Sequence, residues 1–188
     1  LVRYKGETIV KTPMDYNLAI EIAKDIISVP NCEVLLSGEK TAYIMPKTEE
    51  YLIRMTKVVQ YKTTIIKSLD EIQEDILKVS VCDLSGIANS EKYFADKWSD
   101  KAAAAVSGDQ YMDFMDLCVS KGDALKKVQK IYGIYRSECM AFGDNYNDCE
   151  MLKQAEFSYA MASAADDIKK NALYVTDSVE KILRGELL

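Results

Sequence analysis

Three polar side chains, Asp144, Asn147 and Asp148, lie within five positions of one another, directly after the apolar run 139–142. Such a run predicts a buried strand, so we expect these side chains at its carboxyl end, where ligands bind in open α/β sheets. A carboxylate there, followed one helical turn later by an amide and a second carboxylate, suits Mg²⁺ and the phosphate group that it neutralises.

The same residues have a structural explanation. Asn147 and Glu150 are spaced as a helix-capping pair, and Asp144 could complement the dipole of the following helix. Taken alone, the cluster serves a cap and a metal site equally well. A calcium loop of the EF-hand type is a poor match, because Tyr146 and Cys149 occupy positions that require Asp or Asn and Gly.

Lys121 is the candidate cation. Ser120 and Asp123 are spaced as a capping box, which places Lys121 beside the unpaired N–H groups of a helix start. An anion there would feel both the helix dipole and the ammonium group. A solvated lysine explains this short motif alone more simply, but the downstream cluster favours anion binding.

Composition limits the classes of function. The 188 residues, 48% of them hydrophobic, can bury the core of one or two domains. A net charge of −6 argues against nucleic acid or an anionic membrane as the main partner. We find no apolar run of about 18 residues and no signal-peptide pattern. Five dispersed cysteines without a C-x-x-C pair indicate reduced thiols and a cytoplasmic location.

The chain contains no histidine. This excludes a Ser-His-Asp triad, a Cys-His dyad and a histidine-ligated zinc site within it. Acid–base chemistry must therefore come from Asp, Glu, Lys, Tyr or Cys, and a hard, oxygen-coordinated cation fits this inventory best.

Hydrophobic periodicity predicts two regions. In the first, we expect a hairpin over 1–11, helices over 15–27, 48–59 and 90–98, and strands over 32–37, 41–46, 63–66, 76–82, 102–106 and 111–117. From residue 120, helices over 120–132, 147–155, 165–171 and 179–184 alternate with strands over 139–142, 157–161 and 173–176. This alternation predicts a parallel sheet with crossover helices, and a boundary near 116–120.

Three motifs together carry a family resemblance: Ser-Lys-Gly-Asp-Ala-Leu at 120–125, Gly-Asp-Asn-Tyr-Asn-Asp-Cys-Glu-Met-Leu at 143–152, and Tyr-Ala-Met-Ala-Ser-Ala at 159–164. They resemble the C-terminal half of a haloacid dehalogenase-like (HAD) phosphatase of the Cof type. The resemblance implies an α/β protein with a partial Rossmann-like core over 116–188. It also implies a C2-type α/β cap over 12–115, with residues 1–11 connecting core and cap.

The resemblance also implies roles for single residues. Asp144 matches a Mg²⁺ ligand, and Asp148 an acidic neighbour that supports the metal site. Lys121 matches the lysine that neutralises the phosphate and steadies the nucleophile, which makes Lys121 and Asp148 the catalytic candidates. Asn147 matches a residue that contacts the phosphoryl group. The implied activity is hydrolysis of small phosphorylated metabolites, such as sugar phosphates, through a phospho-aspartate.

The chain departs from the family in one respect that matters for catalysis. It contains no Asp-x-Asp, the motif that supplies the nucleophile and the acid–base group. We therefore expect a fragment that is inactive by itself. Asp83 followed by Ser85 is a near miss, but a polar turn after a strand explains it better. Ala162-Ser163 also replaces the Gly-Asn that is frequent in relatives.

Alternatives stay open at this point. The chain could be a non-catalytic module that binds metal and phosphate, or an exposed apolar sheet edge could pair it with a second copy as a homo-oligomer. Asp109, Asp113 and Asp116 are expected to be surface charges, because their spacing on an extended segment sends them to different faces. Trp98 and the tyrosines either pack the cap or line a substrate pocket.

Overall fold

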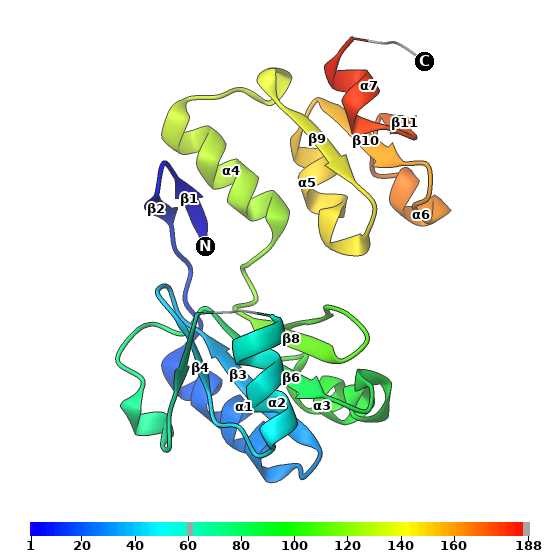
Figure 1. The fold of residues 1–188 in the computed structure, drawn as a ribbon. Helices are drawn as coiled ribbons and strands as arrows, with labels where there is room; N and C mark the ends of the chain where they lie inside the picture. The colour runs from blue at the N-terminus through cyan, green and yellow to red at the C-terminus, as the bar shows by residue number, and fades with distance from the viewer. Residues whose placement is uncertain (60–61, 186–188) are drawn as a thin grey trace. The chain divides into compact units, whose positions relative to one another are not determined.

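The computed structural model describes residues 1–59 and 62–185 and divides into two compact units (Figure 1). The first unit comprises Leu1 and Lys11–Leu117. The second comprises Val2–Val10 and Cys118–Leu188, so the N-terminal segment belongs with the C-terminal part of the chain. Each unit mixes helices and strands, which confirms the predicted α/β class.

The first unit is built on a six-stranded sheet of order β5-β4-β3-β6-β8-β7. Its strands are β3 (Cys32–Ser37), β4 (Ala42–Ile44), β5 (Thr63–Ile65), β6 (Lys78–Asp83), β7 (Ala103–Val106) and β8 (Tyr111–Met115). β4 and β5 pair in parallel, whereas the other neighbouring strands are antiparallel. Its α-helices are α1 (Tyr16–Ser28), α2 (Glu49–Ile53) and α3 (Glu91–Trp98). Each predicted strand of this region is present.

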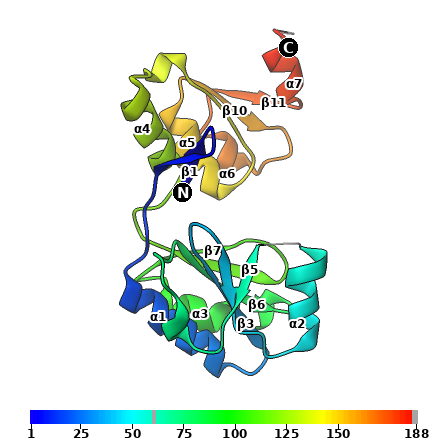
Figure 2. The same ribbon diagram turned by 60° about the vertical axis from the view of Figure 1, so that its left-hand side comes forward.

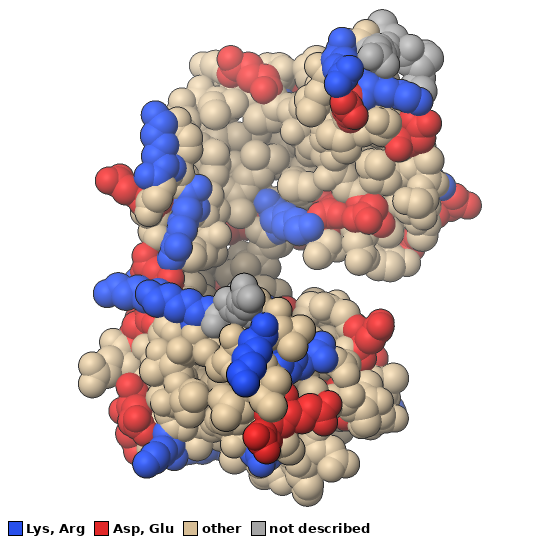
Figure 3. Space-filling view, viewed as in Figure 1, with Lys and Arg blue, Asp and Glu red and all other residues tan. Residues whose placement is uncertain are grey.

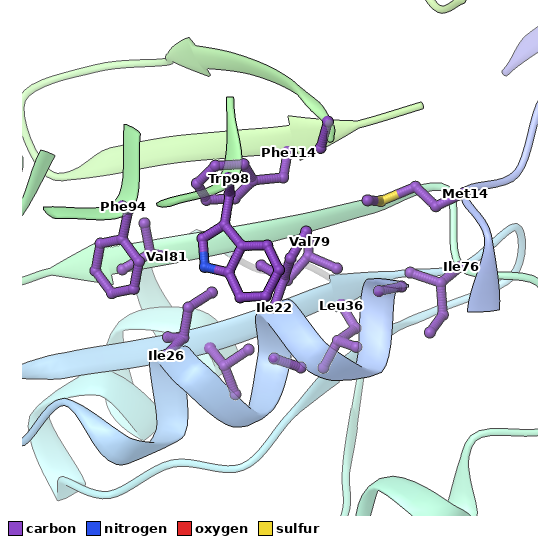
Figure 4. Close-up of a cluster of buried hydrophobic side chains, with 14 of the residues drawn as sticks. Met14, Ile22, Ile26, Leu36, Ile76, Val79, Val81, Phe94, Trp98 and Phe114 are labelled. Carbon is purple, nitrogen blue, oxygen red and sulfur yellow. The ribbon is translucent and has the colours of Figure 1, made fainter. Parts of the chain in front are cut away.

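Helices α1 and α3 cover one face of this sheet. α1 starts where Asp15 accepts a hydrogen bond from the backbone of Leu18 at 2.9 Å, a typical helix cap. Ile22 and Ile26 of α1 are completely buried against β3 and β6, and Trp98 of α3 lies in the same cluster (Figure 4). Alternating residues of β3 and β6 form a second cluster with α2 on the opposite face.

The helix predicted over 48–59 was expected to start at a Thr48 cap and to place Tyr51, Leu52, Met55 and Val59 on one face, but it changes type midway. Thr48 caps α2 as predicted, and the helix continues as a π-helical turn, Arg54–Val58. Tyr51 and Met55 are buried as expected, but Val59 is 45% exposed. Placing Val59 on the buried face was wrong, because a π turn holds more residues than an α turn and rotates this position away.

The second unit contains a parallel sheet of order β11-β10-β9, which confirms the parallel arrangement predicted from residue 120 onward. Its strands are β9 (Met140–Gly143), β10 (Phe157–Met161) and β11 (Tyr174–Thr176), and its α-helices are α4 (Lys121–Tyr132), α5 (Cys149–Gln154), α6 (Asp166–Lys169) and α7 (Val179–Leu183). The predicted hairpin is also present, as β1 (Val2–Tyr4) and β2 (Glu7–Val10). It lies beside α4, where the rings of Tyr4 and Tyr132 meet edge to face at 5.6 Å (Figures 1 and 2).

Small residues let α5 approach the sheet of the second unit. Ala141 of β9 and Ala160 of β10 are buried, and they lie on the side where Leu152 of α5 is completely buried. On the alternate side of the strands, Phe142 stacks on Tyr159 with ring centroids 5.1 Å apart. The end of β9 is therefore supported on both faces immediately before Gly143.

The surface carries mixed charge. Figure 3 shows Lys and Arg side chains interspersed with Asp and Glu on the visible face of each unit, in keeping with 24 basic and 30 acidic residues in the sequence. Over residues 1–59 and 62–185, no helix is both long and apolar enough to cross a membrane. The five cysteines are present as free thiols, of which Cys32, Cys82 and Cys139 are buried.

Candidate active site

Asp148 is the centre of the polar cluster after β9. Its side chain is buried, and its two carboxylate oxygens have different partners. Oδ1 accepts a hydrogen bond from the Lys121 ammonium group. Oδ2 accepts the backbone N–H groups of Asp144 and Asn145 at 3.0 and 3.2 Å. Asp148 thus connects the first residue of α4 to the chain that leaves β9.

Gly143 makes this arrangement sterically feasible. A Cβ atom on Gly143 would lie 2.5 Å from Cβ of Asp148, closer than side-chain carbons approach. Without a side chain, β9 can end against the carboxylate, and a 3₁₀ turn, Tyr146–Asp148, leads directly into α5. The motif glycine therefore has a packing role that its position in the sequence did not disclose.

The capping pair predicted at Asn147 and Glu150 is wrong. The 3₁₀ turn starts before the predicted helix, so its cap is Asn145, whose side-chain oxygen accepts the N–H of Tyr146 at 2.7 Å. Asn145 and Asp148 form the capping box. Asn147 is therefore not the cap residue, and it is exposed.

Lys121 is held at the site by the start of α4. Ser120 caps the helix by accepting the N–H of Asp123 at 3.0 Å, as predicted. Gly122 is buried, and a Cβ there would lie 2.6 Å from Cβ and 2.7 Å from the backbone carbon of Glu150. This contact packs the first turn of α4 against α5, and it sets the position from which Lys121 reaches Asp148.

The surroundings of Asp148 favour its ionised form. Burial by itself would raise the pKa of Asp148, but the Lys121 ammonium and the N–H groups of Asp144 and Asn145 hold that pKa below its usual range. The side chain of Lys121 is 51% exposed. An ammonium group has three donors, so Lys121 can bind Asp148 and still donate to an anion in solvent.

A magnesium ion would find a partial set of ligands here. Asp144 presents an exposed carboxylate, whereas both oxygens of Asp148 already accept hydrogen bonds. Among the described residues, no three Asp, Glu, Cys or His side chains cluster closely enough to hold a metal. Mg²⁺ usually keeps several waters and takes only one or two carboxylates, so the donor set at Asp144 is compatible with it.

The structure therefore brings Lys121 and the backbone of Asp144 together on Asp148 and places Asn147 on the adjoining turn. The sequence analysis missed Asn145 and did not assign Gly122 or Gly143 a role. The Asn-x-x-Asp spacing at 145–148, which overlaps the Asn-x-x-Glu spacing at 147–150, was the available signal for Asn145.

Two aspartates of the first unit have structural roles. Asp83 is buried, and its carboxylate accepts hydrogen bonds from the N–H and hydroxyl of Ser85 and from the hydroxyl of Ser90. This supports the polar turn that the sequence favoured over a nucleophile.

The surface position expected for Asp113 is wrong, because β8 is an internal strand of the sheet. The carboxylate of Asp113 accepts the Ser80 hydroxyl at 2.6 Å and pairs with Lys78 at 2.9 Å.

Comparisons with known proteins agree with this architecture. The family model of haloacid dehalogenase-like hydrolases matches residues 1–182. The 5-amino-6-(5-phospho-D-ribitylamino)uracil phosphatase YbjI of Escherichia coli is 24% identical over 97% of this chain and 71% of its own length. A crystal structure from Eubacterium rectale aligns over 98% of this chain and 73% of its own, with a TM-score of 0.83 and 22% identity.

A solved HAD subclass IIB sugar phosphatase aligns over 96% of this chain and 70% of its own, with a TM-score of 0.75 and 17% identity. Likenesses at this level of identity concern the fold, whereas the family match extends along nearly the whole chain. The chain belongs to the haloacid dehalogenase-like hydrolases, in the Cof-type phosphatase group.

Proposed function

We propose that this protein hydrolyses phosphate monoesters of small metabolites in a Mg²⁺-dependent reaction at the carboxyl end of β9. The observation that carries the proposal is the shared use of Asp148 by the Lys121 ammonium and by the backbone at Asp144 and Asn145. This arrangement holds the half-exposed Lys121 and the backbone of Asp144, whose side chain is exposed, on one buried carboxylate. A phosphate–metal pair requires a cation and a carboxylate at one site.

Each residue then has a distinct task. Lys121 would donate to the phosphoryl oxygens and offset their growing charge, and the Asn147 amide would orient the same group. Asp148 is a positioning residue, because its oxygens hold Lys121 and the N–H groups after β9. Asp144 would bind Mg²⁺, which supplies further neutralisation of the phosphoryl oxygens when bound. The attacking group, an aspartate, follows from the family resemblance alone.

The relatives suggest the class of substrate. The E. coli relative is named for a phosphorylated ribitylamino compound, and one structural neighbour is called a sugar phosphatase. A phosphate ester of a sugar or a polyol is therefore the proposed substrate. Lys121 and Asn147 would bind its phosphate, and this end would be shared by all substrates of the class.

Metal dependence tests the proposal with a matched pair of variants. In the full-length protein, hydrolysis of p-nitrophenyl phosphate should stop when EDTA is added and return when Mg²⁺ is restored. Asp144→Asn should raise the Mg²⁺ concentration for half-maximal activity at least tenfold, whereas Asp166→Asn, at a side chain that is 94% exposed, should not change it. Equal Mg²⁺ requirements in both variants would contradict the proposal, and binding of Mg²⁺ and phosphate without turnover would favour a non-catalytic module.

A further inference from the structure

Arg54 lines a hollow of about 450 Å³ that lies entirely within the first unit. Its other walls are two turns, residues 84–86 after β6 and residues 108–111 at the start of β8. This volume is within the range of small-molecule sites, roughly 300–1,000 Å³. None of the residues assigned to phosphate or metal contributes to it.

The two turns are tied to each other. The side-chain amide of Gln110 donates to the carbonyl of Leu84 at 2.6 Å, and the N–H of Asp83 donates to the carbonyl of Gln110 at 2.9 Å. Asp83 also fixes the first turn, by accepting the N–H of Ser85 at 3.0 Å. The walls are therefore preformed, which lowers the cost of ordering them when a ligand binds.

Glycines shape the walls of the hollow. Gly86 and Gly108 have φ angles of +117° and +132°, which L-residues with side chains rarely adopt. A Cβ added to Gly108 would meet no atom within 4 Å, so the space beside its backbone is open. The turns thus combine a fixed backbone with accessible room.

Among residues 1–59 and 62–185, Arg54 has no ion-pair partner. Its buried Nε atom has no hydrogen-bond partner within the same described residues. Its guanidinium carbon lies 5.7 Å from the centre of the Tyr111 ring. A partly buried cation without an ion-pair partner favours an anion beside it.

Arg54 also starts the π-helical turn, a local irregularity that is frequent at functional sites. An α-helical continuation would rotate the residues that follow it. The π-helical irregularity and a cation without an ion pair therefore coincide at one residue on the wall of the hollow.

The remaining polar groups indicate what else the ligand carries. The amide N–H₂ of Gln110 is engaged with Leu84, which leaves its carbonyl oxygen as an acceptor. Asp109 adds an exposed carboxylate to the wall. Both acceptors suit hydroxyl donors, and the face of Tyr111 suits an adjoining C–H surface.

We propose that this hollow binds a small organic anion that carries hydroxyl groups, such as a sugar phosphate or a sugar acid. Its phosphate or carboxylate group binds Arg54, and its hydroxyls donate to Asp109 and Gln110. The hollow lies within one unit, so this binding is measurable separately from the phosphatase chemistry proposed for the other.

Amide NMR of the ¹⁵N-labelled protein tests the proposal. Ribose 5-phosphate, ribonate and uncharged ribose are titrated in turn, and the amide resonances of Gly86 and Gly108 are followed. Both anions should shift these two resonances in a saturable way, with ribose binding at least tenfold more weakly. Shifts by ribose 5-phosphate alone would restrict the ligand to phosphates, and shifts by ribonate alone would restrict it to carboxylates. No shift at Gly86 and Gly108 with either anion would overturn the proposal.

Variants identify the anion-binding group. Arg54→Gln should weaken ribose 5-phosphate binding at Gly86 and Gly108 at least tenfold, whereas Lys57→Gln removes an exposed charge from the same turn and should leave binding unchanged. Equal weakening in both variants would show attraction by net charge only and would overturn the site. If Arg54→Gln does not fold, the comparison of anions with ribose on the wild-type protein decides by itself. Shifts at the amides of Asp144 and Asn145 report ligand binding at the proposed phosphatase site. The two sites are therefore followed by different resonances, and either proposal can fail while the other is still tested.

Discussion

Asp148 and Lys121 form an ion pair that joins residues 27 positions apart and connects α4 to the end of β9. The aspartate is buried in the fold, whereas the lysine is half exposed and faces solvent. A partly desolvated carboxylate with three partners provides rigidity, and an ammonium with spare donors provides recognition. The proposed chemistry depends on this division.

Removing the buried carboxylate should destabilise the second unit. Asp148→Ala leaves the N–H groups of Asp144 and Asn145 without their acceptor and Lys121 without its partner. We expect a loss of about 2–4 kcal/mol. Hydrogen exchange of peptides that span residues 140–161 measures it, with Asp166→Ala as the exposed control. Equal exchange in the two variants would argue against the structural role of Asp148.

The close contact of Gly122 with Glu150 makes a second prediction. Gly122→Ala places a Cβ within 2.6–2.9 Å of Cβ, the carbonyl carbon and the oxygen of Glu150, so α4 must move away from α5. Overpacking should cost about 1–3 kcal/mol, although alanine normally favours a helix by about 1 kcal/mol. Phosphatase activity should fall more than tenfold because Lys121 moves with the helix. Lys126→Ala on the same helix is the control, and a Gly122→Ala variant that is as stable and active as this control would refute the packing argument.

Acid should weaken the first unit through Asp25. The Asp25 carboxylate accepts hydrogen bonds from Tyr93 at 2.9 Å, Lys97 at 2.5 Å and Trp98 at 2.8 Å. Burial alone would raise the pKa of Asp25, but these three donors bring it below its usual range. A carboxyl group whose pKa is lower in the folded than in the unfolded protein stabilises the folded state at pH values above its unfolded pKa, which is about 3.9. This stabilisation is lost as the pH falls through the pKa of the folded state.

Trp98 is the only tryptophan, so its fluorescence reports on this unit. Asp25→Asn should reduce stability by about 1–3 kcal/mol at pH 7, and the difference from wild type should shrink below about pH 4. Glu21→Gln removes an exposed charge from the same helix and should leave the pH dependence unchanged. A difference between Asp25→Asn and wild type that stays constant down to pH 2 would refute the assignment.

Much of the fold could be predicted because it is encoded locally. The helical spacing of Leu18, Ile22 and Ile26 predicted α1, and the strict alternation after Ser120 predicted the parallel sheet. Local patterns fail where a distant strand decides the environment. Asp113 is buried because Ser80 lies opposite it in the sheet, and spacing within β8 contains no information about that partner.

The site shows the same limit. The motif residues Lys121, Asp144 and Asp148 could be selected from the sequence, but the hydrogen bonds that give each of them a different role could not be predicted. The carboxylate of Asp148 can accept its hydrogen bonds because Gly122 and Gly143 allow three segments of the chain to pack closely. In the sequence, such close packing is visible only as a glycine. Arg54 escaped notice because the π turn that carries it has no simple sequence signature.

The charge of Lys121 is the direct test of the account. The measurement is kcat/KM of the full-length protein for p-nitrophenyl phosphate at saturating Mg²⁺. Lys121→Gln should lower kcat/KM by at least about 100-fold, the usual effect of losing one donor to a developing charge. Lys126→Gln, an exposed position on the same helix, should stay within threefold of wild type. If folded Lys121→Gln also stays within threefold, the ammonium group does not serve the phosphate and the central claim is contradicted.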